Sequence, residues 1–238
     1  MRSQPELTTP QGGRDEAGGR ASKEPGAEKD YRRDRRTWEA FGALFTFGFL
    51  NAVLGPALPY LRAVEHISYL VGSLHQAAYA LGGGLAGALA AREARSISRA
   101  TVIGVGLTGA ALAGLAIGYG ATPVITIAAA FVMSLLGTSA LIRLWAVLAD
   151  IHCAHRAVAM SEGEVSVSLA GIVTPLLIVA LAATALSWRF AFVLGAAATG
   201  SAALWVGRAR MPPPTKGPAR ETRRDDRATC GWLQPTLV

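Results

Sequence analysis

Residues 100–142 contain no charged side chain. A stretch this long is about twice what one helix needs to cross a bilayer, because a helix rises 1.5 Å per residue and the hydrocarbon core is about 30 Å thick. Gly118, Gly120 and Pro123 interrupt it near its middle, where they disfavour a continuous helix. The stretch therefore predicts two consecutive membrane-spanning helices, the second of which runs to about residue 148.

Four further stretches without charge predict four more spans, at residues 40–61, 66–91, 165–186 and 190–207. Only 16% of the chain is charged, whereas a soluble domain is about a quarter charged. Most of those charges lie in residues 1–38 and 208–238. The sequence predicts an all-α fold, a polytopic membrane bundle of six transmembrane helices at residues 39–207 with disordered termini.

The basic residues alternate between the two predicted sides of the membrane. One side collects both tails and four arginines between the spans, which are Arg92, Arg95, Arg99 and Arg156. The other side has only Arg62 and Arg189. By the positive-inside rule, both termini are expected in the cytoplasm and the chain is expected as a multi-pass protein of the cell (inner or plasma) membrane. Residues 1–38 are poor in aliphatic side chains and are expected to be disordered.

Several other classes of protein are disfavoured. The net charge of +7 lies next to apolar runs, so positive charge facing the cytoplasm explains it better than nucleic-acid binding. Ser139 has no histidine in residues 190–207 to act as its base, so no enzyme is expected. His152, Cys153 and His155 lack a fourth ligand, so no metal site is expected. No cofactor is expected either, although a coupling ion such as a proton stays open.

Small residues are frequent in the spans, as in Gly82, Gly83 and Gly84. In lipid they let helix backbones approach closely, which predicts one packed bundle. Three prolines inside predicted spans, Pro56, Pro59 and Pro175, each remove a helical hydrogen bond and are expected to kink or loosen their helices.

Three motifs carry a resemblance to a known family. Residues 48–61 read GFLNAVLGPALPYL, a helix with Gly and Pro that ends in a Leu-Pro turn. Gly87, Arg92 and Arg95 fit a Gly-x-Leu-Ala-Asp-Arg-x-Gly-Arg loop, and residues 188–192 read WRFAF, with Trp188, Arg189 and Phe192. In this order the motifs resemble the amino-terminal half of the major facilitator superfamily of secondary transporters.

The sequence departs from the family pattern at four places. Ala91 replaces the Asp of the loop motif, and Ala94 replaces its second Gly, so the acidic half of that loop is missing. Met133 stands where many members have an Arg in helix 4, and residues 171–175 lack the Gly-Pro-x-x-Gly-Gly run of the antiporters.

The resemblance implies transport of a small solute by alternating access, with a substrate site between two six-helix halves. The chain covers one half, and residues 211–226 resemble the start of the cytoplasmic linker between halves. We therefore expect a homodimer or a separate second half, in addition to the lipid bilayer and the solute, as partners. The alternative is a truncated, non-transporting membrane protein or an assembly subunit whose arginine-rich tails recruit partners or anionic lipid.

Candidate cavity residues follow from polarity inside the spans. Asn51, His75, Gln76 and Tyr79 either line a polar cavity or satisfy helix packing, and His75 is a candidate for titration in a proton-coupled cycle. Arg143 is the one charged residue inside a predicted span. Its side chain either reaches the cytoplasmic interface or pairs with Asp150, or it serves a solute path or substrate site.

Charges at the cytoplasmic ends of the spans form a candidate gate. Asp150 could pair with Arg92 or Arg95 and hold the inward face shut, with Arg156 on the same side. The alternative is a set of solvated charges, where an exposed pair contributes about 0 to 1 kcal/mol. Ser161 and Glu164 fit a capping box that would open the fifth span.

Overall fold

The computed structural model describes residues 31–152 and 155–208, except for the side chains of residues 91, 93–96, 207 and 208. The chain separates into Met1–Tyr31 and Arg32–Val238, and the helices of the described residues belong to the second unit. The predictions for residues 1–30 and 209–238, including the disordered tail and the linker-like segment, concern positions outside the described residues.

The described residues form helices and no strands, which confirms the all-α fold class. Each predicted span corresponds to one helix. The helices are α1 (Arg35–Glu65), α2 (Tyr69–Ser96), α3 (Arg99–Tyr119), α4 (Pro123–Ile151), α5 (Arg156–Ala182) and α6 (Phe190–Arg208).

Four of these helices, α1, α3, α4 and α5, are long and apolar enough to cross a membrane. The apolar part of α6, Phe190–Val206, is shorter than the other spans. The helix α2 is 28 residues long and mixes glycines and alanines with polar side chains such as His75 and Gln76. The length and apolar character of these helices support the predicted membrane protein.

Local signals explain where the helices begin and end. Asp34 caps α1, because its Oδ1 accepts a hydrogen bond of 2.9 Å from the backbone of Thr37, and the helix therefore starts four residues before the predicted boundary of the bundle. At its other end, His66 has a positive φ of 53° and its backbone N–H donates to Arg62. The predicted break separates α3 from α4, which starts with Pro123 at its first turn.

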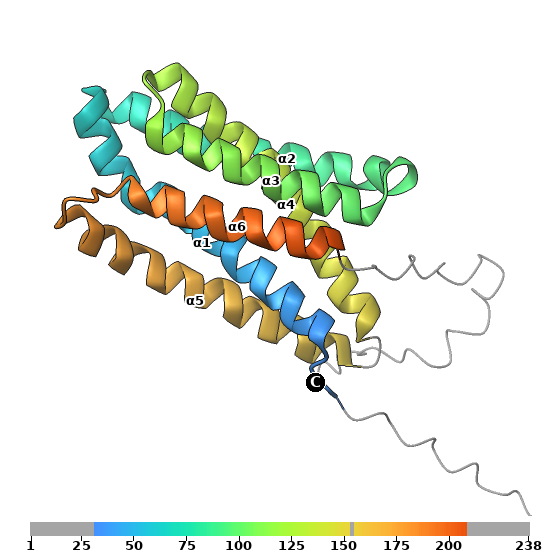
Figure 1. The fold of residues 1–238 in the computed structure, drawn as a ribbon. Helices are drawn as coiled ribbons and strands as arrows, with labels where there is room; N and C mark the ends of the chain where they lie inside the picture. The colour runs from blue at the N-terminus through green and yellow to red at the C-terminus, as the bar shows by residue number, and fades with distance from the viewer. Residues whose placement is uncertain (1–30, 153–154, 209–238) are drawn as a thin grey trace, which may run out of the picture. The chain divides into compact units, whose positions relative to one another are not determined.

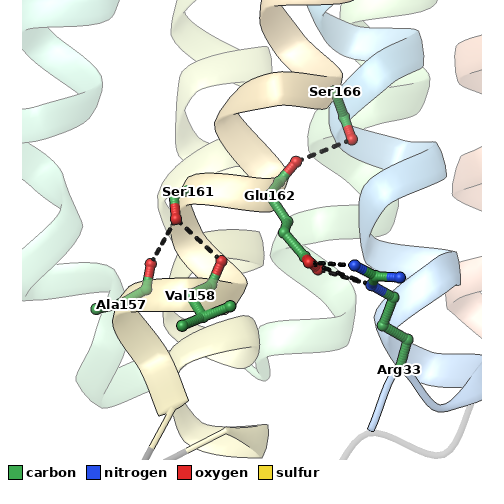
Figure 2. A network of polar contacts seen from close by, with 6 residues as sticks. All are labelled: Arg33, Ala157, Val158, Ser161, Glu162 and Ser166. Carbon is green, nitrogen blue, oxygen red and sulfur yellow. Dashed lines mark hydrogen bonds and ion pairs between the residues drawn. The ribbon is translucent and has the colours of Figure 1, made fainter. Parts of the chain in front are cut away.

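The predicted capping box at the start of the fifth span is wrong. The helix α5 begins at Arg156, nine residues earlier, and ends at Ala182, so the predicted capping box lies inside a helix. Ser161 Oγ donates to the carbonyl oxygens of Ala157 and Val158, one turn earlier, at 2.9 and 3.1 Å (Figure 2). The first turns of α5 carry Arg156, Glu162 and Glu164. Because these turns extend beyond the apolar stretch, the charged side chains need not enter the hydrocarbon core of the membrane.

Neighbouring helices connect at alternating ends of the bundle. We call the end where α1 begins and α6 ends the tail end; it also holds the α2 to α3 and α4 to α5 connections. The opposite end, with the other three connections, is the far end. In Figure 1, α1 lies between α5 and α6. The helix α2 packs mainly on α4, which packs on α3, and α3 packs on α6.

Several helix contacts leave no space for a side chain. A Cβ atom at Gly82 of α2 would lie 2.3 Å from the carbonyl oxygen of Phe131 on α4. A Cβ atom at Gly106 of α3 would lie 2.6 Å from the carbonyl oxygen of Leu136, also on α4. These contacts confirm the predicted close packing through small residues where α2 and α3 meet α4. Met133 of α4, which stands where many family members have an Arg, is buried in the core. Gly84 and Gly87, in contrast, face open space.

Helices α1 and α5 continue through the three prolines predicted to kink them. Pro56 and Pro59 lie inside α1, and Pro175 lies inside α5. Each proline still leaves one carbonyl of its helix without the usual donor. Thr174 satisfies a neighbouring carbonyl, since its Oγ1 donates to Ala170 at 2.7 Å.

Candidate functional site

Two predicted cavity residues, Asn51 and Gln76, are exposed in the bundle. On α1, Asn51 shares its open face with Gly55 and Pro59, four and eight residues later, while the opposite face packs into the core. On α2, Gln76 lies on a face that is also open. Asn51 lies near the middle of α1, where an exposed amide needs water or another protein, because lipid supplies no hydrogen bonds.

The predicted cavity residue His75 is instead fully buried. Its Nδ1 lies 3.2 and 3.3 Å from the carbonyl oxygens of Gly72 and Val71, one turn earlier on α2. Its Nε2 lies 3.0 Å from Oγ1 of Thr126 on α4, which is also fully buried. The imidazole therefore joins α2 to α4 near the far end of the bundle.

Thr126 extends this contact to α1. Its Oγ1 lies 3.1 Å from Oε1 of Glu65, the last residue of α1. The other carboxyl oxygen, Oε2, is buried and has no hydrogen-bond partner among the described residues. Glu65, Thr126 and His75 thus form a chain of polar contacts across three helices, which we call the far-end triad.

Arg62 borders the far-end triad. Its guanidinium carbon lies 3.4 Å from the centre of the Tyr69 ring, a cation–π contact. Its Cδ lies 2.5 Å from where a Cβ of Gly72 would be, so a larger residue at position 72 would require the Arg62 side chain to move. Its Nε is buried without a hydrogen-bond partner among the described residues, and no ion pair described in the structure joins it to Glu65.

Tyr79 follows His75 by one turn on the same face of α2 and is half-buried. Gly83, the next residue on this face, approaches α4 so closely that an added Cβ would lie 3.1 Å from Oγ of Ser134. The face of α2 that carries His75 and Tyr79 therefore packs on α4. Of the four predicted cavity residues, only Asn51 and Gln76 are exposed.

Arg143 is buried on α4, with 8% of its surface exposed. Its Nη2 donates a hydrogen bond of 2.7 Å to the backbone carbonyl of Ala90 on α2. This contact ties α2 and α4 together toward the tail end.

The structure gives Asp150 a partner that the sequence analysis did not name. Arg99, the first residue of α3, donates to Asp150 at the end of α4. The predicted partners were Arg92 and Arg95, and neither forms this ion pair. Arg92 is exposed and makes no ion pair with a described residue, and the side chain of Arg95 lies outside the described set.

A second ion pair lies at the tail end. Arg33, just before α1, holds Glu162 of α5 through its Nε and Nη2, with N to O distances of 2.5 to 3.2 Å (Figure 2). It fastens the segment that precedes α1 to the first turns of α5. Arg156, the first residue of α5, is exposed, and so is Gly87 of the loop motif.

Asp34 and His152 are connected through Thr37. The hydroxyl of Thr37 donates to Oδ1 of Asp34 at 2.6 Å and lies 2.8 Å from Nε2 of His152. Burial raises the pKa of Asp34, but the hydrogen bonds from Thr37 and the positive charges of His152 and Arg36 more than offset this. The pKa of Asp34 therefore lies below its ordinary value of 3.8.

The residues of the helix 6 motif pack at the far end. Trp188 is buried, and its ring stacks on Tyr60 of α1 with centroids 6.1 Å apart. The guanidinium of Arg189 lies 5.6 Å from the Trp188 ring. Phe192 is buried against Gly118 of α3. In this structure the motif fixes α6 to α1 and α3.

No group of three or more His, Cys, Asp or Glu side chains is placed to hold a metal ion within the part of the chain that the structure describes. Cys153 of the predicted loop lies outside that part. His152 has Thr37 as a neighbour rather than a metal-binding arrangement.

The sequence alone did not predict a role for Glu65 or Thr126, or the pairing of Arg99. Glu65 stands beyond the predicted end of the first span, and Thr126 looks like an ordinary residue of an apolar helix. One signal was present, because alternating topology brings the end of the first span and the start of the fourth to the same side of the membrane. Arg99 was expected at the same end of the bundle as Asp150, but without a partner.

The helices and their polar contacts define a polytopic helical membrane protein. The sequence model of the Major Facilitator Superfamily matches residues 40–235, so the chain belongs to this family of membrane transporters. The resemblance carried by the loop and helix 6 motifs is thereby confirmed.

Comparison with solved structures supports the same fold. A crystal structure of the peptide transporter POT, a mutant in complex with sulfate, superposes with a TM-score of 0.61 at 14% identity. The match covers 83% of this chain and 47% of that chain, so this chain spans about half the length of the transporter. At this identity the likeness shows the fold alone. A comparison with curated protein sequences gives no match.

Proposed function

We propose that this chain moves a small solute across the cell membrane as one six-helix half of a secondary transporter, completed by a second six-helix body. That body is a second copy of the chain or a separate half. The observation that carries the proposal is the match of 83% of this chain to 47% of a transporter. Transport by alternating access needs two bodies that rock about a site between them.

The exposed faces of the bundle support a second body. The helix α5 has a row of exposed apolar side chains at helical spacing, which are Val165, Leu169, Ile172, Leu176 and Val179. The helix α2 is exposed at Leu74 and Leu81 and carries the open Gly84 and Gly87. Lipid covers apolar side chains as well, so these rows alone do not require a partner.

Asn51 and Gln76 supply the stronger argument. Both amides are exposed in the bundle, inside helices that are expected to cross the membrane. Facing lipid, each would lose hydrogen bonds at a cost of several kcal/mol. A second body that encloses water over this surface removes that cost and creates the polar cavity in which a solute would bind.

The orientation is part of the proposal. Both termini and the pairs Arg99–Asp150 and Arg33–Glu162 then lie on the cytoplasmic side. In this orientation the Arg99–Asp150 pair would fasten the cytoplasmic ends of α3 and α4, as the gate predicted for Asp150 requires, but with a different arginine. No cofactor is proposed.

Uptake by vesicles tests the function. The purified chain is reconstituted into liposomes, and uptake of isotope-labelled alanine, dialanine, glucose, citrate and phosphate is measured with and without a pH gradient. For a solute that enters, N51A and Q76A should each slow uptake about tenfold or more, equivalent to about 1.4 kcal/mol. Thr108→Ala, at an exposed polar position of α3, is the matched control and should leave uptake unchanged.

Two outcomes would contradict the proposal. If N51A and Q76A retain the original rate and affinity, neither residue lines the solute path. A stable lone monomer that takes up none of the five solutes would instead support the alternative of an assembly subunit.

A further inference from the structure

One face of α1 stays open where the helix begins. Arg35, Trp38, Gly42 and Phe45 follow each other at intervals of three and four residues, so they share this face. The side chain of Arg35 is 81% exposed and Trp38 is 58% exposed, whereas Gly42 and Phe45 are half-buried. We call these four residues the α1 strip.

The helices α5 and α6 meet α1 just beyond the α1 strip. Thr199 of α6 donates from Oγ1 to the carbonyl oxygen of Thr46 at 3.1 Å. Thr174 of α5 donates from Oγ1 to the carbonyl oxygen of Phe49 at 3.4 Å. The helix α1 runs between α5 and α6, which have few contacts with each other (Figure 1). Closer to the tail end, a Cβ atom at Gly42 would meet no atom within 4 Å, so this part of α1 is open to another molecule.

Arg35 keeps two donor nitrogens for a ligand. Its Nε donates at 2.8 Å to Oε1 of Glu39, a buried carboxylate one turn later. The structure gives Nη1 and Nη2 no partner among the described residues. Asp34 caps the first turn through the backbone of Thr37, so the α1 strip is built from side chains. A guanidinium held in this way can donate to two oxygens of one phosphate group.

Two neighbouring arginines add positive charge around the α1 strip. Arg32 and Arg36 are exposed, and neither makes an ion pair with a described residue. Each basic side chain near an anionic lipid surface is attracted to it. The start of α1 therefore complements a negatively charged headgroup.

Trp38 continues the α1 strip from polar to apolar. Its ring meets the buried Phe41 edge to face, with centroids 6.0 Å apart and an angle of 85°. Tryptophan favours the boundary between lipid headgroups and acyl chains. At 1.5 Å per residue, Trp38 lies about 5 Å and Gly42 about 10 Å further along the helix than Arg35. The order of charged, aromatic and open apolar positions matches the order of headgroup, interface and acyl chain in a phospholipid.

We propose that the α1 strip binds one anionic phospholipid from the leaflet that the tail end faces. The phosphate accepts hydrogen bonds from Nη1 and Nη2 of Arg35, and an acyl chain lies beside Trp38 over Gly42 and Phe45. The inference goes beyond the transport proposed above and does not depend on it, because lipid binding is measured without a solute and without a second body.

Native mass spectrometry of the full chain, purified in detergent and freed of lipid, tests the proposal. One phosphatidylglycerol should bind per chain, more tightly than phosphatidylcholine with the same acyl chains. Arg35→Gln should weaken the binding of phosphatidylglycerol about fivefold, because one arginine contributes about this factor at an anionic lipid surface. Gly42→Leu should weaken it too, because the new side chain fills the space of the acyl chain. This second variant keeps the pair of Arg35 and Glu39, so its effect is independent of that pair.

Two matched variants separate the α1 strip from a general attraction between charges. Arg36→Gln removes another exposed charge, about 100° around the helix from Arg35. Gly104→Leu fills a half-buried position on α3 that is equally open. Both should stay close to the wild-type affinity.

Four outcomes would overturn the proposal. They are equal losses for R35Q and R36Q, unchanged binding for G42L, equal affinities for the two lipids, and displacement of phosphatidylglycerol by glycerol phosphate. The last compound has the headgroup without acyl chains, so displacement would indicate a site for a free anion rather than for a lipid.

Discussion

Arg99, the first residue of α3, donates a hydrogen bond to Asp150, the penultimate residue of α4. The two helices are antiparallel neighbours, so this ion pair closes the tail end of their interface. Both side chains are partly exposed, at 25% and 30%, which places the pair between surface and buried ion pairs.

We expect this pair to contribute modestly to stability. In a double-mutant cycle of R99Q and D150N, the coupling free energy should be about 0.5 to 1 kcal/mol, measured by thermal or denaturant unfolding in detergent. Arg92→Gln, at an exposed position without an ion pair among the described residues, should show no coupling to D150N. Zero coupling between R99Q and D150N, or equal coupling for R92Q, would argue against the contact.

Replacement of glycine by alanine should affect stability differently at two positions of α2. Gly82→Ala places a Cβ 2.3 Å from a carbonyl oxygen of α4, so the helices must move apart and the melting temperature should fall. Gly84→Ala has open space around the new methyl group and should be neutral or stabilise by up to about 1 kcal/mol, because alanine favours helix. Equal effects of the two substitutions would contradict the close approach of α2 and α4 at Gly82.

We expect the stability of the chain to depend on acidic pH through Asp34, which caps α1. The pKa of Asp34 in the folded chain lies below its ordinary value of 3.8, so its stabilising effect is fully present above that value and is lost as the pH falls through the lowered pKa. Asp34→Asn keeps a capping side chain but removes the charge. Between about pH 5 and about pH 2, the melting temperature of this variant should fall less steeply than that of the wild type. A steeper fall would contradict the direction of the shift.

Labelling of single cysteines tests the proposed orientation. In a chain whose Cys153 and Cys230 are replaced by serine, a membrane-impermeant maleimide added to intact cells should label Ala185→Cys, in the α5 to α6 connection. It should label Ile97→Cys, in the α2 to α3 connection, only after permeabilisation. Both positions are exposed in the structure, so access to the reagent depends on the side of the membrane. The reverse pattern would invert the topology.

Charge depletion and glycine and proline breaks were sufficient to predict the order of the helices, because both depend on local sequence. The start of α5 was not predictable in this way, since its first two turns are charged and extend beyond the apolar stretch. The burial of His75 depends on the register of α2 against α4, which close contacts such as that of Gly82 determine. Sequence periodicity alone does not determine that register.

Some residues of the candidate site were likewise predictable from local sequence, whereas others depend on contacts between helices. Asn51 and Gln76 are predictable as polar residues inside apolar spans, and they are exposed as a cavity role requires. Glu65 and Thr126 gain their importance only through contact with each other and with His75, from positions 51 or more residues apart in the sequence. The partner of Asp150 was missed for the same reason, since three arginines near the α2 to α3 connection compete for it.

The number of chains in the native complex tests the central claim most directly. Native mass spectrometry of the chain, extracted from membranes in lipid nanodiscs, should show two copies or one copy with a second membrane protein. Leu176→Gln, on the exposed row of α5, should reduce that complex, and Leu112→Gln, equally exposed on α3, should preserve it. A single copy alone in every nanodisc, unaffected by either variant, would contradict the proposal that a second six-helix body completes this chain.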